Sequence, residues 1–163
     1  MPSLLYLVKQ LELAVRAGLD DLVRPVGITA LQFTALTVLE RHDGLSAAQL
    51  ARDSFVTAQS MADMIRTLEH RDLIRRERNP TNRRELHLRL TPEGRALLAS
   101  VATPVRELEA RMVGTLTPHE TADFRRALVT AWQSLTPTLT SGTAPQYRAN
   151  RQSPRPPAHS EPE

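Results

Sequence analysis

Hydrophobic residues at the start of the chain recur at helical spacing. One set lies three or four residues apart: Leu4, Val8, Leu11, Val15, Leu19 and Leu22. A second apolar set on the same segment comprises Leu5, Leu7, Leu13, Ala14 and Ala17. Steps of three and four residues are typical of an α-helix, so the pattern predicts a helix over residues 4–23. A helix that is apolar on two sides needs two partners, and the second is either the protein's own core or another subunit.

Three further helices begin at recognisable N-caps. Thr29 with Gln32, and Ser46 with Gln49, have the form of a capping box, in which the two side chains satisfy each other's free backbone N–H groups. Thr57 is a third N-cap. These signals predict helices over residues 30–41, 47–53 and 58–71. Because only a few residues join the last two, they have the form of a helix-turn-helix.

The apolar positions also predict which face of each helix is buried. In the helix over residues 30–41 the inward residues are expected to be Leu31, Ala35, Leu36 and Leu39. In the helix over residues 58–71 they are expected to be Met61, Ile65 and Leu68, with Met64 beside them. The outward face of that second helix is then largely polar: Ala58, Gln59, Ala62, Asp63, Arg66 and His70.

A β-hairpin is predicted next. Residues 85–90 alternate polar and apolar, which is the period of a strand, and residues 73–78 are too short and too interrupted for a helix. Asn79-Pro80-Thr81-Asn82-Arg83-Arg84 separates the two segments, and its Pro and Asn residues favour a turn. The hairpin would therefore carry two arginines at its tip, like a wing.

The last ordered elements are two helices. Thr91-Pro92-Glu93 starts the first, which extends to about residue 115, and Pro104 inside it is expected to kink or divide it. Thr117 and Glu120 form another capping box that opens a helix ending near Leu135. Six of the twelve prolines fall in residues 137–163, so this tail is expected to be disordered.

Composition and motifs argue against several classes of function. The chain has no cysteine, which removes disulfides, thiolate nucleophiles and cysteine-based zinc sites. Its five histidines show no ligand spacing, and no nucleophile elbow, P-loop or dinucleotide-binding motif is present. No secretory signal or membrane-length apolar run is seen. We therefore expect a cytoplasmic protein that is not an enzyme and has no cofactor or metal.

Positive charge is concentrated in one segment, although the net charge is only +3. Residues 71–89 contain arginine at positions 71, 75, 76, 78, 83, 84 and 89, against acids at 72, 77 and 85. Taken alone, this segment is either a solvated basic hairpin or a phosphate-binding wing. The neighbouring helix presents Thr57, Gln59, Ser60 and Arg66, and Gln reads adenine while Arg reads guanine. The combination favours DNA binding.

At this point residues 4–136 resemble the multiple-antibiotic-resistance regulator (MarR) family of winged-helix transcription factors. The resemblance is sharpest over residues 45–94, where the matching stretches are Leu45–Ala51, Met61–Glu69, Leu73–Arg76, Asn79–Arg84 and Leu88–Gly94. In the family the wing commonly reads Asp-Pro-x-Asp-Arg-Arg before a strand that ends in Leu-Thr-x-x-Gly. The fold class expected is thus mainly α, a winged helix-turn-helix with a two-stranded β-wing.

The resemblance implies a homodimer held by N- and C-terminal helices, here about residues 4–24 and 92–136, around a winged helix of about residues 29–90. It implies that the helix over 58–71 enters the major groove of an inverted-repeat operator and that the wing reaches the minor groove, with Arg84 as the wing-tip arginine. It also implies a possible small aromatic or phenolic ligand that releases the protein from DNA. Residues 1–136 would form a single domain.

The chain departs from the family pattern at three positions. Asn79 and Asn82 stand where Asp is usual. The second Asp of the family helps orient the wing arginine through an ion pair; Asn82 can still accept a hydrogen bond but lacks the charge. Asp63 stands on the reading helix where many relatives have a non-acidic residue. It either accepts a hydrogen bond from cytosine N4 or pairs with Arg66 or Arg52 and orients that side chain.

The function expected from the sequence is that of a dimeric, sequence-specific DNA-binding transcriptional regulator, most simply a repressor, with double-stranded DNA as partner. The residues expected to contact DNA are Thr57, Gln59, Ser60, Asp63, Arg66, Arg76, Asn82, Arg83 and Arg84. Phe33 and Arg106 are candidates for lining a ligand pocket, although no sequence signal distinguishes binding from packing there. The alternative is a winged-helix protein-interaction module that does not bind DNA specifically.

Overall fold

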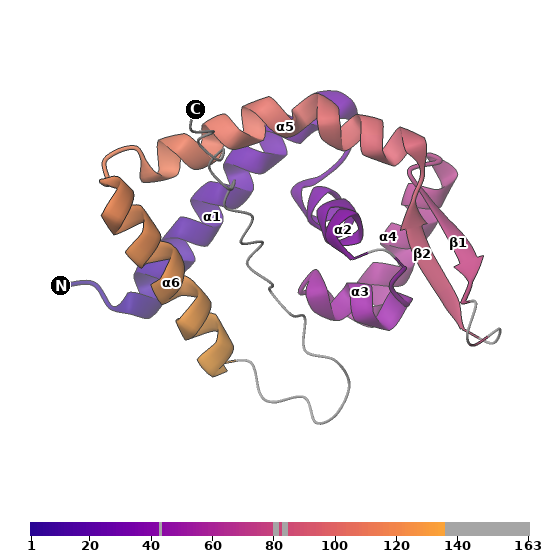
Figure 1. Ribbon diagram of the computed structural model, residues 1–163, viewed down its shortest axis with the longest axis horizontal. Coiled ribbons are helices and arrows are strands. Elements are labelled where there is room, and N and C mark those ends of the chain that lie inside the picture. Colours follow the sequence, from indigo (N-terminus) through magenta and orange to yellow (C-terminus); the bar gives the residue numbers. More distant parts are fainter. Residues whose placement is uncertain (43, 80–81, 83–84, 136–163) are drawn as a thin grey trace, which may run out of the picture. The chain divides into compact units, whose positions relative to one another are not determined.

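A computed structural model describes residues 1–42, 44–79, 82 and 85–135 (Figure 1). Its elements are α1 (Leu4–Val23), the 3-10 helix η1 (Arg24–Val26), α2 (Ala30–Arg41), α3 (Ala47–Asp53), α4 (Ala58–His70), β1 (Ile74–Arg78), β2 (Leu86–Leu90), α5 (Pro92–Val113) and α6 (Pro118–Leu135). These bounds lie within two residues of the sequence predictions. The chain divides into two compact units, Met1–Thr115 and Leu116–Glu163, and each is described by itself.

The helices of the first unit begin at the predicted caps. Thr29 Oγ1 accepts from Gln32 N at 3.2 Å, and Gln32 Oε1 accepts from Thr29 N at 3.0 Å. Ser46 and Gln49 form the same reciprocal pair at 3.3 and 2.9 Å. Both predicted capping boxes are confirmed, and each satisfies two backbone N–H groups that the helix itself leaves unpaired.

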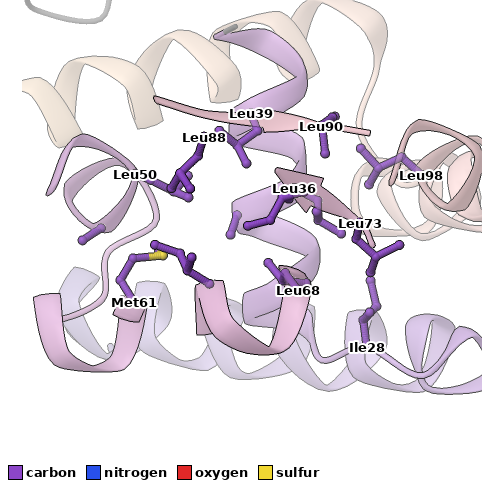
Figure 2. Packing of buried hydrophobic residues seen from close by; sticks show 14 of the residues in the cluster. Ile28, Leu36, Leu39, Leu50, Met61, Leu68, Leu73, Leu88, Leu90 and Leu98 are labelled. Carbon is purple, nitrogen blue, oxygen red and sulfur yellow. The ribbon is translucent and has the colours of Figure 1, made fainter. Parts of the chain in front are cut away.

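The core of the first unit surrounds α2, whose neighbours are α1, α3, α5 and β2. Leu36 and Leu39 of α2 are buried in one apolar cluster (Figure 2) with residues of α3, α4, both strands and α5: Leu50, Met61, Ile65, Leu68, Ile74, Leu88, Leu90 and Leu98. Burying one such side chain contributes about 1.5–3 kcal/mol. The core therefore holds α4 and the hairpin to the same helix.

One inward prediction for α2 is wrong. Ala35, Leu36 and Leu39 are buried, but Leu31 is 38% exposed. Leu31 lies in the first turn of α2, where the side chain lines a cleft against α1 and does not enter the core around Leu36. Apolar spacing alone does not separate a core face from a cleft wall, because both require the same residue types.

The hairpin is antiparallel, with Ile74 opposite Leu90 and Arg76 opposite Leu88. Leu88 also forms an isolated bridge to Leu45, whose carbonyl accepts from Leu88 N at 2.7 Å. Ile74, Leu88 and Leu90 face the core, so the base of the hairpin is fixed on one side by apolar packing. The predicted two-stranded wing on a mainly α fold is confirmed.

α5 runs without a break from Pro92 to Val113. Of the two outcomes expected at Pro104, a kink or a division, the division does not occur. Proline cannot donate to the carbonyl four residues earlier, here that of Ser100, and it costs about 3 kcal/mol in a helix interior. The packing of α5 against α1, α2 and β2 outweighs that loss and keeps the helix continuous.

The second unit is described as far as Leu135 and contains α6. Its predicted capping box is present, because the Glu120 carboxylate accepts from Thr117 N and Oγ1, both at 2.8 Å, and Thr117 Oγ1 accepts from Glu120 N at 3.3 Å. The Thr117 backbone N–H, followed by its hydroxyl, holds the pKa of Glu120 below its usual range. Leu128, Trp132 and Leu135 are exposed on this helix.

The junction between β2 and α5 generates a prediction on stability. Thr91 Oγ1 donates to Asp72 O at 2.6 Å and accepts from Gly94 N at 3.0 Å, which holds Gly94 close to the residues just before β1. A Cβ at Gly94 would lie 2.1 Å from the carbonyl oxygen of Leu73, which is backbone. We expect Gly94→Ala to lower the free energy of unfolding by about 3 kcal/mol, the upper part of the range for overpacking. Chemical denaturation measures this, with Ser100→Ala on the exposed side of α5 as control; equal stabilities would contradict the close approach.

The end of α4 generates a second prediction, of opposite sign. Asp72 follows the C-cap Arg71 with φ 55°, the left-handed conformation that glycine adopts without strain. We expect Asp72→Gly to raise the free energy of unfolding by about 0.5–1 kcal/mol, because the steric cost is removed. Asp21→Gly, in the right-handed interior of α1, is expected to lower it by a similar amount. Thermal denaturation of both variants checks the pair, and a destabilised Asp72→Gly protein would contradict the explanation.

Candidate nucleic-acid interface

The turn between α3 and α4 sets the direction of the second helix. Phe55 has φ 58°, and its N–H donates to Arg52 O at 3.2 Å. Val56 N then donates to Ala51 O at 3.1 Å, so the chain reverses within four residues. Thr57 begins α4 directly afterwards, with its hydroxyl accepting from Ser60 N at 3.1 Å. The predicted helix-turn-helix is therefore present and its turn is fixed by backbone hydrogen bonds.

The polar face of α4 is exposed because the opposite face is fully buried. Met61, Ile65 and Leu68 are at most 2% exposed. The predicted DNA-contacting side chains of this segment all lie on the solvent side: Thr57, Gln59, Ser60, Asp63 and Arg66. Thr57 also donates to Ser60 Oγ at 3.0 Å, which orients both hydroxyls at the helix N-terminus. The helix thus presents amide, hydroxyl and guanidinium groups together, the set that reads base edges.

Asp63 forms an ion pair with Arg66, one helical turn along α4. Both side chains are more than half exposed. Of the two arginines considered as partners from the sequence, the structure therefore pairs Asp63 with Arg66. An exposed pair of this kind contributes about 0–1 kcal/mol, so its effect is on the orientation of Arg66 more than on stability. Contact between Asp63 and a cytosine stays a prediction.

Arg76 ties the wing to α4. Its Nε and Nη2 donate to the two carboxylate oxygens of Glu69 at 2.9 and 3.1 Å. This two-armed geometry is the strongest form of an arginine–carboxylate contact. Arg76 was predicted as a DNA contact; that stays a prediction, and here the side chain holds β1 against the end of α4.

Glu77 neutralises two arginines that face each other across the hairpin. Arg75 and Arg89 are cross-strand partners, and like charges in that position repel. The Glu77 carboxylate lies 2.7 Å from Arg75 Nε and 2.8 Å from Arg89 Nε. Glu77 therefore offsets the repulsion between the two arginines.

Asn79 and Glu85 are hydrogen-bonded to each other at the ends of the two strands, next to the wing tip. Asn79 N donates to Glu85 O, and Asn79 Nδ2 to Glu85 Oε2, both at 2.9 Å. Asn82 is exposed, and its carbonyl accepts from Glu85 N at 2.9 Å. The predicted DNA contacts Arg83 and Arg84 lie outside the described residues.

A cleft lies between α1, α2 and the helix-turn-helix turn, with a volume of about 620 Å³. Its lining includes Leu5, Val8, Arg16, Leu31, Ser54 and Phe55. Ser54 is 2% exposed, and its hydroxyl has no hydrogen-bond partner among the described residues. Phe55, by contrast, is 76% exposed.

The charged rim of the cleft comes from α1. Glu12 accepts from Lys9 Nζ at 2.9 Å and lies 2.5 Å from Arg16 Nη2. The hydrogen bond from Lys9, followed by that from Arg16, holds the pKa of Glu12 below its usual range. Phe33 and Arg106, the residues suggested from sequence, do not line this cleft. The sequence carried no signal for Ser54 and Phe55, because the cleft joins segments far apart along the chain.

Within the described ranges, no three His, Cys, Asp or Glu side chains come together as metal ligands. In the same ranges no single helix is long and apolar enough to cross a membrane; α1 with η1 and α2 pass such a test only when taken together, across an 84° bend.

Comparison with known proteins agrees with this geometry. Residues 28–86 match the MarR family. The HTH-type transcriptional repressor Rv2887 of Mycobacterium tuberculosis is 33% identical over 123 residues, which are 76% of this chain and 88% of the relative. The crystal structure of that protein with salicylic acid has a TM-score of 0.66 and 32% identity, and covers 80% of this chain and 97% of the other.

The S. aureus MepR–DNA complex gives a TM-score of 0.73 at 23% identity, covering 83% of this chain and all of the other, a likeness of fold alone. The identity and coverage of the M. tuberculosis repressor, together with the helix-turn-helix and the wing described above, establish that the chain belongs to the MarR family.

Proposed function

We propose that this protein is a homodimeric transcriptional regulator that binds an inverted-repeat DNA operator and represses transcription. The observation that carries the proposal is the outward face of α4, where Gln59, Asp63 and Arg66 are exposed beside an arginine-rich hairpin. Its relatives are transcriptional repressors and regulators, which makes an enzyme the less suitable assignment. A protein of this kind works on chromosomal DNA, and we place it in the cytoplasm for that reason.

Dimer formation is supported by the apolar surface of the helices at both ends of the chain. On α1 the exposed apolar residues are Leu4, Leu5, Leu7, Val8 and Leu13, and on α6 they are Leu128, Trp132 and Leu135. Monomeric proteins rarely expose such rows of large apolar residues. We propose that both helices meet a second copy, and that residues 1–136 act as one domain in the dimer.

We assign a distinct role to each group of residues proposed to bind DNA. Thr57 would contact phosphate at the start of α4, where the helix dipole favours anions. Gln59, Ser60, Asp63 and Arg66 would read base edges. The wing residues Asn82, Arg83 and Arg84, with Arg76 at its base, would follow the minor groove and its phosphates. Most of the affinity would come from phosphate contacts and fall as salt rises.

The direct test is selection of bound duplexes from a random pool at near-physiological salt. An enriched inverted repeat with half-sites about one helical turn apart is the expected result. Weak, salt-sensitive retention without enrichment would instead favour the alternative, a winged helix that acts as a protein-interaction module.

Replacement of Arg66 tests the reading face. We expect Arg66→Ala to lose about 1–3 kcal/mol of discrimination at one base pair in each half-site, because a bidentate arginine–guanine contact supplies that much. Competition binding with single-base operator variants measures this. Arg111→Ala, in the last turn of α5, removes the same charge away from α4 and should leave the discrimination intact. Uniform loss at every base would show that Arg66 contacts phosphate only.

We also propose that a small aromatic acid binds the cleft and weakens DNA binding. The M. tuberculosis relative has been crystallised with salicylic acid and with p-aminosalicylic acid. In this chain Phe55 would stack on such a ring, Ser54 would hydrogen-bond to it, and Arg16 would attract its carboxylate. Ser54 and Phe55 belong to the turn that starts α4, so an occupant of the cleft would act directly on the reading helix.

Ser54 gives this ligand proposal its test. We expect Ser54→Ala to bind salicylate at least about fivefold more weakly, since one hydrogen bond is lost, while the unliganded protein is unchanged or up to about 1 kcal/mol more stable, since a buried free hydroxyl is removed. Calorimetric titration and denaturation measure the two effects, with Ser100→Ala as control. Equal salicylate affinity in both variants would exclude this hydroxyl from the site.

A further inference from the structure

The connection between α1 and α2 is short and is fixed by side-chain hydrogen bonds. We define the joint as residues 24–29, which comprise η1, Gly27 with φ 75°, and the next two residues. Asp20, in the last turn but one of α1, accepts from Ala30 N at 2.7 Å through its carboxylate. This places a negative charge at the positive end of α2 and fixes α2 to α1 across the joint.

Arg71, at the end of α4, contacts the backbone of the same joint. Its Nη2 donates to Val26 O at 2.9 Å, and its Nη1 contacts Gly27 O. Arg71 is the C-cap of α4, and its own N–H donates to Thr67 O at 3.2 Å. The contact thus connects the last turn of the reading helix to carbonyls 44 and 45 residues earlier in the chain.

The contact depends on both residues involved. A planar guanidinium reaches two adjacent carbonyls at once, which a lysine ammonium does not do with the same fixed geometry. Gly27 leaves room for it, because a Cβ there would lie 3.3 Å from Arg71 Nη2. Apolar packing between α4 and α2 is non-directional, whereas two hydrogen bonds to fixed carbonyls define an orientation.

We propose that Arg71 is a positioning residue for DNA recognition: by fixing the end of α4 to the α1–α2 joint, it sets the separation of the two reading helices in the dimer. The inference rests on the proposed function, in which α1 joins the two copies and α4 reads DNA. A rotation of α4 relative to α1 then occurs in both copies, so its effect on the separation of the two reading helices is doubled. One base pair moves a half-site by about 3.4 Å along the DNA axis and about a tenth of a turn around it.

The variants are chosen to separate positioning from charge. Arg71→Ala removes the guanidinium, and Arg71→Lys keeps the positive charge but loses the two-armed contact. Arg24→Ala is the matched control, since the Arg24 side chain lies in the same joint, is 74% exposed and pairs with the similarly exposed Asp21 at 2.8 Å. Each protein is titrated against the selected operator and against two derivatives with one base pair added or removed between the half-sites, at several salt concentrations.

Positioning by Arg71 predicts that both Arg71 variants bind the selected operator about tenfold more weakly, the effect of losing a charge-assisted hydrogen bond. They should also discriminate less among the three spacings, while the slope of log K against log salt stays that of the wild type. Partial unfolding does not imitate this, because it lowers binding to all three duplexes equally. Arg24→Ala should match the wild type in every measurement.

The opposite result is equally distinct. If Arg71→Lys binds like the wild type and Arg71→Ala loses affinity equally at all spacings, with the salt slope reduced by about 1.8 because the dimer loses two contacts, then Arg71 is a phosphate contact and the inference is wrong. Unchanged binding in both variants overturns it as well. If the wild type selects no operator at all, it is the proposed function that fails, a result that differs from all of these.

Discussion

The burial of one face of α4 is the constraint on which the whole interface depends. Met61 and Leu68 are completely buried and Ile65 is 2% exposed, against Leu36 and Leu39 of α2. Burial of each large apolar side chain contributes about 1.5–3 kcal/mol, so turning α4 about its axis would cost several times that. The polar residues at the other positions of the helix must therefore face solvent. The exposed polar face that we propose reads DNA is thus a consequence of core packing.

The wing is oriented by the same core through different contacts. Its base shares Ile74, Leu88 and Leu90 with the apolar cluster, and the Arg76–Glu69 pair adds a directional link to α4. The bridge between Leu45 and Leu88 joins the hairpin to the start of the α3 segment. Since the hairpin and α4 are each fixed to common neighbours, the described parts of the two elements that we propose contact DNA are held in a defined arrangement.

Local signals in the sequence were enough for most of this fold. Capping boxes such as Ser46 with Gln49 act over three residues, so they can be recognised without any knowledge of the tertiary structure. The features that the sequence did not reveal depend on distant segments. Leu31 lines a cleft because α1 lies opposite, and Arg71 meets Val26 across 45 residues. The left-handed turn at Phe55 was also hidden, because that conformation is usually signalled by glycine.

The carboxylates that pair with arginines affect how strongly such a protein binds its operator and other DNA. Arg66, Arg75, Arg76 and Arg89 each lie against a carboxylate in the described structure. Any phosphate that draws Arg76 away must replace its two hydrogen bonds to Glu69 and leave that carboxylate close to the DNA. Non-specific binding relies almost entirely on phosphate neutralisation, so it bears this penalty without compensation. The same penalty falls on a correct operator, but there the base contacts offset it.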